Sequence, residues 1–169
     1  MLQHNTIETG GLGWYIRLSV RQITKRVLKH CNNPRFVQAT EKVMFSHVMV
    51  GVKDLEVSKT FYDAVLGTLG IGPGVANKSR YFYRSPTGLF GITLPINGEP
   101  ATHANGSTIG FAMQSPEQAD AFHAAGLANG GTTCEDPPGW REFPTGRIYL
   151  AYLRDPDKHK ICAMYRPAN

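Results

Sequence analysis

The chain lacks the features that mark several protein classes. No apolar run approaches the ~20 residues that a membrane-spanning helix needs. The three cysteines, Cys31, Cys134 and Cys162, stand far apart and form no C-x-x-C pair, so neither a zinc ribbon nor a disulfide framework is indicated. Unpaired thiols are typical of the reducing cytoplasm, where we expect this protein.

Acidic residues are missing between Glu8 and Glu41, although basic residues are frequent there. Basic and acidic residues balance in 44–169, so the net charge of +5 resides in 1–43. Such asymmetry indicates a boundary, and we predict a basic N-terminal extension, 1–43, followed by one domain, 44–169. The basic residues of the extension are Arg17, Arg21, Lys25, Arg26, Lys29, Arg35 and Lys42.

The extension contains a predicted helix at 14–30, with an apolar stripe at helical spacing and a basic stripe beside it. Three interpretations stay open: an appendage that meets an anionic partner such as lipid or nucleic acid, a transit-like segment, or a dispensable extension. We expect no nucleic-acid function, although the basic helix leaves an anionic partner as an alternative. The apolar stripe is Ile16, Val20, Ile23 and Val27.

A new pattern begins at Met44. Residues 45–52 predict a strand, and 54–69 predict a helix that Asp54 caps. Two further strands follow at 80–84 and 89–94, joined by a turn, with a weak strand near Val75. The first half of this domain is therefore predicted to be β-α-β-β, with the weak strand making a β-α-β-β-β unit.

This pattern occurs twice. Residues 47–70 align without a gap on 108–131, at a shift of 61 residues, and Asp54 aligns with Ser115, which begins a capping box. We therefore predict that 44–166 contains two copies of one β-α-β-β-β unit, with a second helix near 116–129. The identical pairs are Phe61 and Phe122, Ala64 and Ala125, Leu66 and Leu127, and Gly70 and Gly131.

Strand alternation separates two faces in each copy. One face is apolar and suits packing against a helix: Val48, Val50 and Val52, with their counterparts Ile109, Phe111 and Met113. The opposite face is small or polar, as a cavity lining would be: His47, Met49 and Gly51, with Thr108, Gly110 and Ala112.

Two motifs carry a family resemblance. The segment "VKDLEVSKTFY" follows His47 and ends at Tyr62, and "DPDKHKI" spans 155–161. With these motifs residues 44–166 resemble the vicinal oxygen chelate superfamily, which includes glyoxalase I, bleomycin-resistance proteins and extradiol dioxygenases. The resemblance implies an α+β fold of paired β-α-β-β-β modules that form a cupped, barrel-like sheet, and a homodimer.

The resemblance also implies a metal site. Four strand positions usually supply two histidines and two glutamates that hold a divalent metal such as zinc, nickel, manganese or iron. Here the positions carry His47, Thr108, Cys162 and, near 91–93, Gly91-Ile92-Thr93. Since one ligand of four is retained, we expect no catalytic metal, with a zinc remnant on His47 and Cys162 as the alternative.

The segment 134–152 has no counterpart in the first copy and is predicted to be a loop over the cavity mouth, with ordinary loop packing as the alternative. Its aromatic and basic residues would suit a planar or anionic ligand. His103 lies on another loop, where we expect a solvated side chain, with a position toward the cup as the alternative. His123 is expected on the second helix, away from the cup. The predicted ligand-binding residues are His47, Met49, Thr108, Trp140, Arg141, Tyr149, Tyr152 and Cys162, and His47 is also the candidate catalytic residue.

Three functions remain open at this point. The protein binds a small organic molecule without a catalytic metal, or it is a metal-dependent lyase (lactoylglutathione lyase-like) or dioxygenase with substituted ligands. The third hypothesis is a resistance protein that sequesters a drug. The sequence argues against the metal-dependent enzyme, since metal catalysis requires a bound metal. It does not identify the ligand.

Overall fold

The computed structural model describes residues 44–168. The extension 1–43, with the helix predicted at 14–30, lies outside the described residues. The first module consists of β1 (His47–Gly51), α2 (Leu55–Gly67), β2 (Val75–Ala76), β3 (Arg80–Ser85) and β4 (Gly88–Thr93). The second consists of β5 (Ile109–Ala112), α3 (Pro116–Ala128), β6 (Thr132–Thr133), β7 (Gly139–Phe143), β8 (Gly146–Arg154) and β9 (Lys160–Tyr165).

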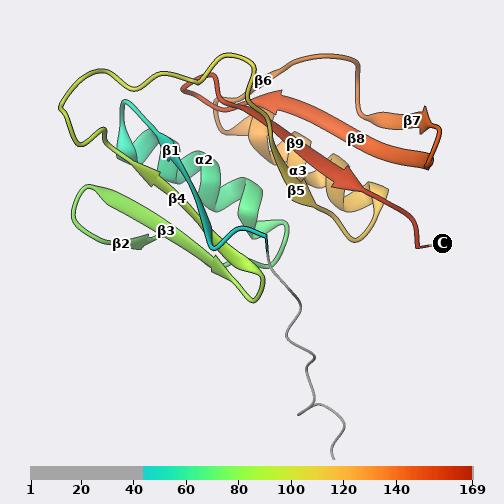
Figure 1. Cartoon of the computed structure of the whole chain (residues 1–169), viewed down its shortest axis with the longest axis horizontal. Helices are drawn as coiled ribbons and strands as arrows, with labels where there is room; N and C mark the ends of the chain where they lie inside the picture. Colours follow the sequence, from blue (N-terminus) through green and yellow to red (C-terminus); the bar gives the residue numbers. More distant parts are fainter. Residues whose placement is uncertain (1–43, 169) are drawn as a thin grey trace, which may run out of the picture. The chain divides into compact units, whose positions relative to one another are not determined.

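The two modules share one topology. The first sheet has the order β1-β4-β3-β2 and the second the order β5-β9-β8-β6. In the first sheet β1 pairs parallel with β4, and in the second β5 pairs parallel with β9. The predicted duplication and the α+β class are confirmed. Within residues 44–168 the two sheets stay separate, so the expected barrel-like sheet is an open cup (Figure 1). Among these residues, no helix is both long and apolar enough to cross a membrane.

Side-chain caps start both helices where the sequence predicts them. Asp54 Oδ1 accepts hydrogen bonds from the backbone N–H groups of Glu56 and Val57 at 2.9 and 3.1 Å. Ser115 Oγ accepts one from the Gln118 N–H at 3.2 Å, and proline occupies the first turn. These bonds satisfy donors that a helix start leaves without intrahelical partners.

The core lies between the sheets and the helices, on the predicted apolar strand faces. Val50, Val52, Phe61 and Phe122 are buried there. Phe111 on β5 connects the modules, because its ring centroid lies 5.4 Å from that of Phe90 and 5.6 Å from that of Phe122. The opposite faces of both sheets are turned toward the viewer in Figure 1, with the helices behind them.

One sequence prediction about this domain is wrong. The segment expected to form a loop over the cavity mouth contains β7, which pairs antiparallel with β8. The pairing runs from Gly139 opposite Leu150 to Phe143 opposite Gly146. The physical reason is a tight turn at Gly146, whose φ is +108°, which folds the segment back as a hairpin. The proline and glycine content of the segment hid this strand.

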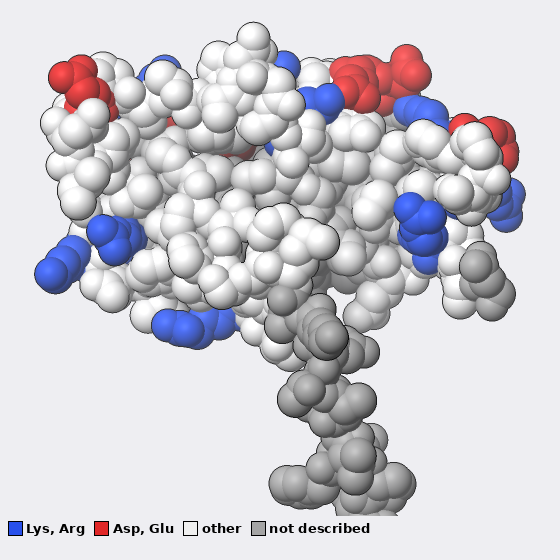
Figure 2. Space-filling model, in the orientation of Figure 1, with Lys and Arg blue, Asp and Glu red and all other residues white. Residues whose placement is uncertain are grey.

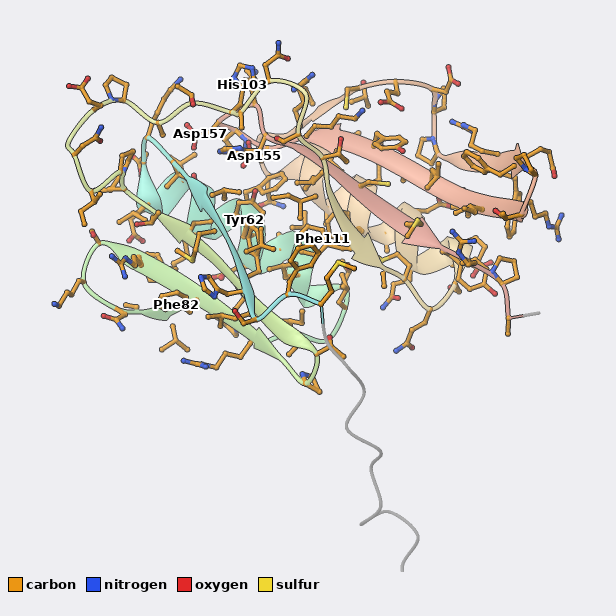
Figure 3. The ribbon with its side chains drawn as sticks, in the orientation of Figure 1. Tyr62, Phe82, His103, Phe111, Asp155 and Asp157 are labelled. Carbon is orange, nitrogen blue, oxygen red and sulfur yellow. The ribbon has the colours of Figure 1, made fainter. Side chains whose placement is uncertain are left out.

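The turn between β8 and β9 joins the modules through buried polar groups. Tyr62 of α2 donates a hydrogen bond to Asp155 Oδ2 at 2.7 Å, and the His159 N–H donates to Asp155 Oδ1 at 2.8 Å. Ser58 Oγ donates to Asp157 Oδ2 at 3.0 Å, and His159 Nε2 donates to the carbonyl of Gly51 at 2.7 Å. Figure 3 shows Asp155 and Asp157 above Tyr62, beside one end of β1. We call these residues the intermodule turn contacts.

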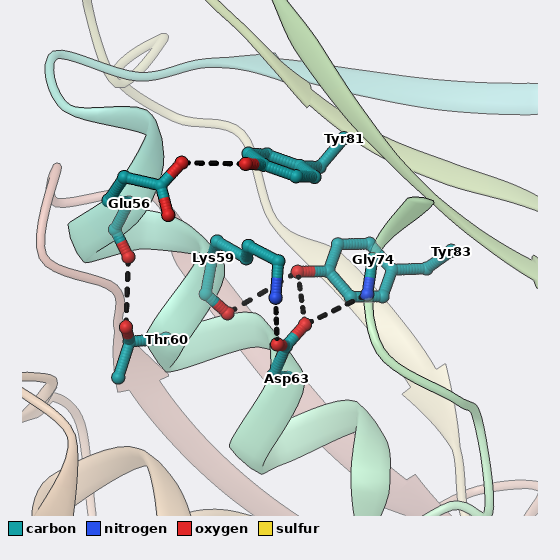
Figure 4. A network of polar contacts seen from close by, with 7 residues as sticks. All are labelled: Glu56, Lys59, Thr60, Asp63, Gly74, Tyr81 and Tyr83. Atoms are coloured by element: carbon teal, nitrogen blue, oxygen red, sulfur yellow. Dashed lines mark hydrogen bonds and ion pairs between the residues drawn. The ribbon is translucent and has the colours of Figure 1, made fainter. Parts of the chain in front are cut away.

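A second polar network holds β3 against α2 (Figure 4). Asp63 accepts hydrogen bonds from the Gly74 N–H at 2.9 Å and the Tyr83 hydroxyl at 3.0 Å, and pairs with Lys59. Burial alone would raise the pKa of Asp63, but the hydrogen bonds from Gly74, Lys59 and Tyr83 outweigh it and lower that pKa. The ionised carboxylate therefore stabilises the fold.

Replacing Asp63 by asparagine should lower the free energy of unfolding by about 1–3 kcal/mol at pH 7. Because the pKa of Asp63 is lowered in the folded state, this stabilisation is present above the unfolded pKa of about 4 and is lost as the pH falls through the folded value. Urea unfolding of both proteins at pH 7 and pH 3 measures the difference, which should shrink at pH 3. Exposed Asp136→Asn serves as the control, and an undiminished difference at pH 3 would contradict the ionic role.

Candidate functional site

An apolar recess of about 490 Å³ lies on the open face of the first sheet. Its volume falls within the range of small-molecule sites. Strand alternation turns His47 and Met49 of β1 into it, while Val50 points into the core. The recess is lined by His47, Met49, Arg80, Phe82, Leu89, Thr93, Leu94 and Ile96, and we call it the apolar recess. Figure 3 shows Phe82 at the lower part of this sheet.

His47 lies at the edge of the apolar recess with one ring nitrogen engaged. Its Nδ1 is 2.9 Å from Ser46 Oγ, and the residue is exposed. Within residues 44–168 no hydrogen bond is made to its Nε2. This nitrogen is therefore available to donate to, or accept from, a molecule in the recess.

Met49 covers the middle of the same sheet. A Cβ atom on Gly91 would clash with Met49 Sδ, and would lie 2.8 Å from Met49 Cε and 3.0 Å from Phe82 Cδ1. Met49 and Gly91 are also paired in the register of β1 and β4. The side chain of Met49 thus occupies the space that any side chain at position 91 would need.

A second recess, of about 160 Å³, borders the second sheet and is polar. It contains Thr108, together with His103 and other residues of the segment that connects the modules. Two basic side chains from neighbouring strand ends, Arg154 and Lys160, complete it. Because these two cations define its character, we call it the cationic recess.

Cys162 lies on the open face of the second sheet, but it is buried. It packs with Ile148 and Leu150, with Tyr152 and Met164 beside them. Burial raises the pKa of the Cys162 thiol, so the neutral form prevails at pH 7. Tyr152 pairs with Cys162 in the register of β8 and β9, and its ring lies 4.7 Å from Lys160 Nζ.

Two of the remaining predicted ligand residues, Trp140 and Tyr149, lie on the other face of this sheet. Trp140 pairs with Tyr149, and alternation along β8 puts Tyr149 on the face opposite Tyr152. Tyr149 donates to Asp120 of α3 at 2.7 Å, and this bond raises its pKa to about 12. Trp140 stacks edge-on against Tyr149 and carries the Arg147 guanidinium 4.3 Å from its ring centroid.

Arg141 is held within its own turn. Its guanidinium donates to the carbonyl oxygens of Pro137 at 2.8 Å and Trp140 at 3.1 Å, and it approaches Asp136 at 3.9 Å. It lines neither recess. The structure therefore brings His47 and Met49 together and puts Thr108 in the cationic recess. Tyr149 bonds to α3 instead, with Trp140 packed against Tyr149.

Comparison with known proteins identifies the family. The sequence model of the glyoxalase/bleomycin resistance protein/dioxygenase superfamily matches residues 44–163. The chain belongs to this superfamily. A crystal structure of a glyoxalase/bleomycin resistance protein from Albidiferax ferrireducens T118 is 80% identical, with a TM-score of 0.72 over 73% of this chain and 99% of that one. Among curated proteins no significant match is found.

More distant members share the fold alone. A glyoxalase-related enzyme from Fulvimarina pelagi is 21% identical, with a TM-score of 0.57 over 73% of this chain and 88% of that one. A glyoxalase/bleomycin resistance protein/dioxygenase family enzyme from Burkholderia phytofirmans PsJN is 18% identical, with a TM-score of 0.55 over 71% of this chain and 96% of that one.

The donor set of this superfamily member does not fit a resident divalent metal. Of the four positions that the resemblance assigns, His47 offers an imidazole, Thr108 a hydroxyl and Cys162 a buried neutral thiol. In the stretch 91–93, Gly91 has no side chain and Met49 fills the adjoining space, Ile92 is buried in the core, and Thr93 offers only a hydroxyl. Among residues 44–168 no group of three or more His, Cys, Asp or Glu residues is placed to hold a metal ion.

Several lining residues of the two recesses were not anticipated. Arg80 and Phe82 lie within a predicted strand, and alternation along it could have identified their shared face. Leu94 and Ile96 follow the end of β4, and no periodic signal extends to them. Arg154 precedes the motif at 155–161 and Lys160 lies within it, whereas the family resemblance points to Cys162.

Proposed function

We propose that this protein binds a small organic molecule in its open cup, and that it does so without a resident catalytic metal. The apolar recess carries the proposal, because its volume of about 490 Å³ suits a small ligand and its lining is mainly apolar with one imidazole. A packed core would fill such space with large side chains. A cytoplasmic location and a homodimer belong to the same proposal.

His47 is the residue that this proposal assigns to ligand contact. Its Nε2 makes no hydrogen bond within the described part of the chain, and Met49 beside it gives an adaptable apolar surface. An imidazole in this place can orient a ligand, or act as a general base if the ligand carries an acidic C–H or O–H group. Binding requires only the first of these roles.

The two alternatives differ in what they need. Sequestration of a drug needs the same recess and no chemistry, so it is a variant of the proposal. Turnover assays distinguish a protein that only binds its ligand from one that also transforms it. A metal-dependent lyase or dioxygenase needs ligands that Gly91, Thr108 and Cys162 do not supply. The lack of a side chain at Gly91, the weak hydroxyl ligand at Thr108 and the buried neutral thiol at Cys162 support the metal-free proposal.

Replacing His47 by alanine should weaken binding of 2-naphthamide, a neutral planar probe, by about 0.5–1.5 kcal/mol, the value of one hydrogen bond. Titrations followed by two-dimensional NMR measure the affinity, and the amides of Met49, Phe82 and Leu89 should shift. Val50→Ala is the matched control on the same strand, because Val50 is buried in the core.

The control should lower the free energy of unfolding by about 1–3 kcal/mol and leave the affinity unchanged. The proposal fails if 2-naphthamide shifts no amide around the apolar recess. It also fails if Val50→Ala weakens binding as much as His47→Ala.

A further inference from the structure

At the cationic recess a row of polar side chains crosses three neighbouring strands. Arg154 ends β8 and is the direct antiparallel partner of Lys160, which begins β9. The parallel register of β5 and β9 pairs Ile109 with Ile161, so Thr108, one residue earlier, is level with Lys160. Alternation puts the three polar side chains on the open face of the sheet. Because neighbouring strands lie ~4.8 Å apart, all three side chains can contact one small ligand.

Arg154 and Lys160 form a cross-strand pair of like charge. Like charges directly opposite each other destabilise a sheet. Both side chains are half-buried, and no acidic residue lines the recess among the residues that the structure describes. An anion bound between the two cations would offset their repulsion, so the pair favours an anionic ligand.

One of the two cations has a partner outside the recess. Lys160 forms an ion pair with Glu135, and its Nζ also lies 4.7 Å from the centroid of the Tyr152 ring. The Arg154 side chain makes one hydrogen bond within residues 44–168, from Nη1 to the carbonyl of Lys158 at 2.8 Å. A guanidinium has five N–H donors, so most of them remain for the oxygen atoms of a ligand.

The segment that connects the modules adds neutral polar groups to the same recess. His103, Asn105 and Ser107 line it, and Figure 3 shows His103 on this segment above Asp155. The Ser107 N–H donates to the carbonyl of Ala104 at 2.9 Å, which holds the segment in a turn. The exposed imidazole of His103 and the exposed amide of Asn105 can each donate to an anionic oxygen.

The size of the cationic recess limits its ligand. About 160 Å³ is less than the ~300–1,000 Å³ of sites for drug-sized molecules, so the recess suits an ion or a single functional group. Its donors come from three strands and from the connecting segment. A phosphate group presents more acceptor oxygens than a carboxylate, and in more directions, so it matches this arrangement better.

We infer that the cationic recess is a binding site for a phosphate group, either free phosphate or the end of a phosphomonoester, held by Arg154, Lys160 and Thr108. This inference goes beyond the proposed function and does not depend on it, because the cationic recess and the apolar recess share no lining residue. In Figure 2 basic side chains lie along the margin of a largely uncharged face, as expected if charge and apolar surface serve separate sites.

The probes that test the inference are inorganic phosphate and glycerol 3-phosphate, with acetate at equal ionic strength as the control anion. Two-dimensional NMR titration of the full chain in a phosphate-free buffer measures the affinities. Both phosphate probes should shift the amides of Thr108, Arg154 and Lys160, and should bind at least about tenfold more tightly than acetate. Tighter binding of glycerol 3-phosphate would assign the site to a phosphomonoester, and otherwise free phosphate is its ligand.

Two pairs of variants separate the recess from general surface charge. Arg154→Gln and Lys160→Gln should each weaken phosphate binding about tenfold, whereas Arg166→Gln, which removes an exposed cation outside the recess, should leave it unchanged. Glu135→Gln should strengthen phosphate binding about threefold, because Lys160 then loses its competing carboxylate. Asp136→Asn, at the neighbouring exposed acid, is the matched control and should have no effect.

The NMR spectrum of each variant reports whether it is folded, independently of any ligand. Unchanged phosphate affinity in both Arg154→Gln and Lys160→Gln would overturn the inference, as would acetate binding as tightly as phosphate. It would also be overturned if neither phosphate probe shifted an amide of the recess, or if Glu135→Gln weakened binding. The amides of Met49 and Phe82 should not respond to phosphate, and shifts at these two residues alone would contradict a separate site.

Discussion

Replacement of Asp155 by alanine is expected to lower the free energy of unfolding by about 3–5 kcal/mol, because two buried donors lose their acceptor at once. Asp155 is fully buried and accepts the Tyr62 hydroxyl and the His159 N–H. Tyr62 is itself fully buried, so water cannot replace the lost acceptor without opening the contact between the modules.

Urea unfolding followed by circular dichroism measures this loss, and Asp136→Ala provides the control. Asp136 is an acidic residue of the same module whose side chain is 84% exposed, so its removal should change stability by less than about 0.5 kcal/mol. Tyr62→Phe removes one of the two bonds and should cost less than Asp155→Ala. A loss below about 1 kcal/mol in Asp155→Ala would mean that the intermodule turn contacts do not hold the modules together.

Replacement of Phe122 by alanine should lower the free energy of unfolding by about 3–5 kcal/mol, the usual cost of deleting a buried aromatic ring. Phe122 is fully buried on α3, and its ring packs on Phe111 of β5. Phe61, its counterpart in the first module, is equally buried. Because the duplication gives the two rings the same role, Phe61→Ala should cost a similar amount.

Leu127→Ala is the matched control on the same helix. Leu127 is 40% exposed, whereas its counterpart Leu66 is fully buried, so the two leucines differ although the repeat aligns them. Thermal unfolding should show a small change for Leu127→Ala and a large one for Leu66→Ala. Equal effects of the two leucine substitutions would contradict the burial that the structure assigns.

The secondary structure could be predicted where local signals act alone. Asp54 and Ser115 cap helices by bonds to N–H groups a few residues away, and the alternation of β1 fixes which of Met49 and Val50 is buried. The hairpin of β7 was missed because its pairing with β8 depends on partners rather than on a periodic pattern. The sequence likewise does not reveal that Asp155 bonds to Tyr62, since these residues are distant in the chain.

The candidate site was predicted in part for the same reason. His47 and Met49 lie on a strand whose alternation is clear, and they line the apolar recess together. Trp140 and Tyr149 have the chemistry of ligand-binding residues, yet their position depends on the register of the hairpin, which puts Tyr149 against Asp120 of α3 and Trp140 beside Tyr149. Arg154 and Lys160 line one recess with Thr108 only because the register of β8 and β9 makes them direct partners, which the sequence does not show.

The central claim, a cup that functions without a resident metal, is tested most directly by elemental analysis of the full chain purified without chelator. The account predicts no stoichiometric zinc, nickel, manganese or iron, because Gly91, Thr108 and Cys162 leave His47 without partner ligands. One tightly held metal ion per chain in the wild type, absent from His47→Ala but retained in His103→Ala, would contradict it.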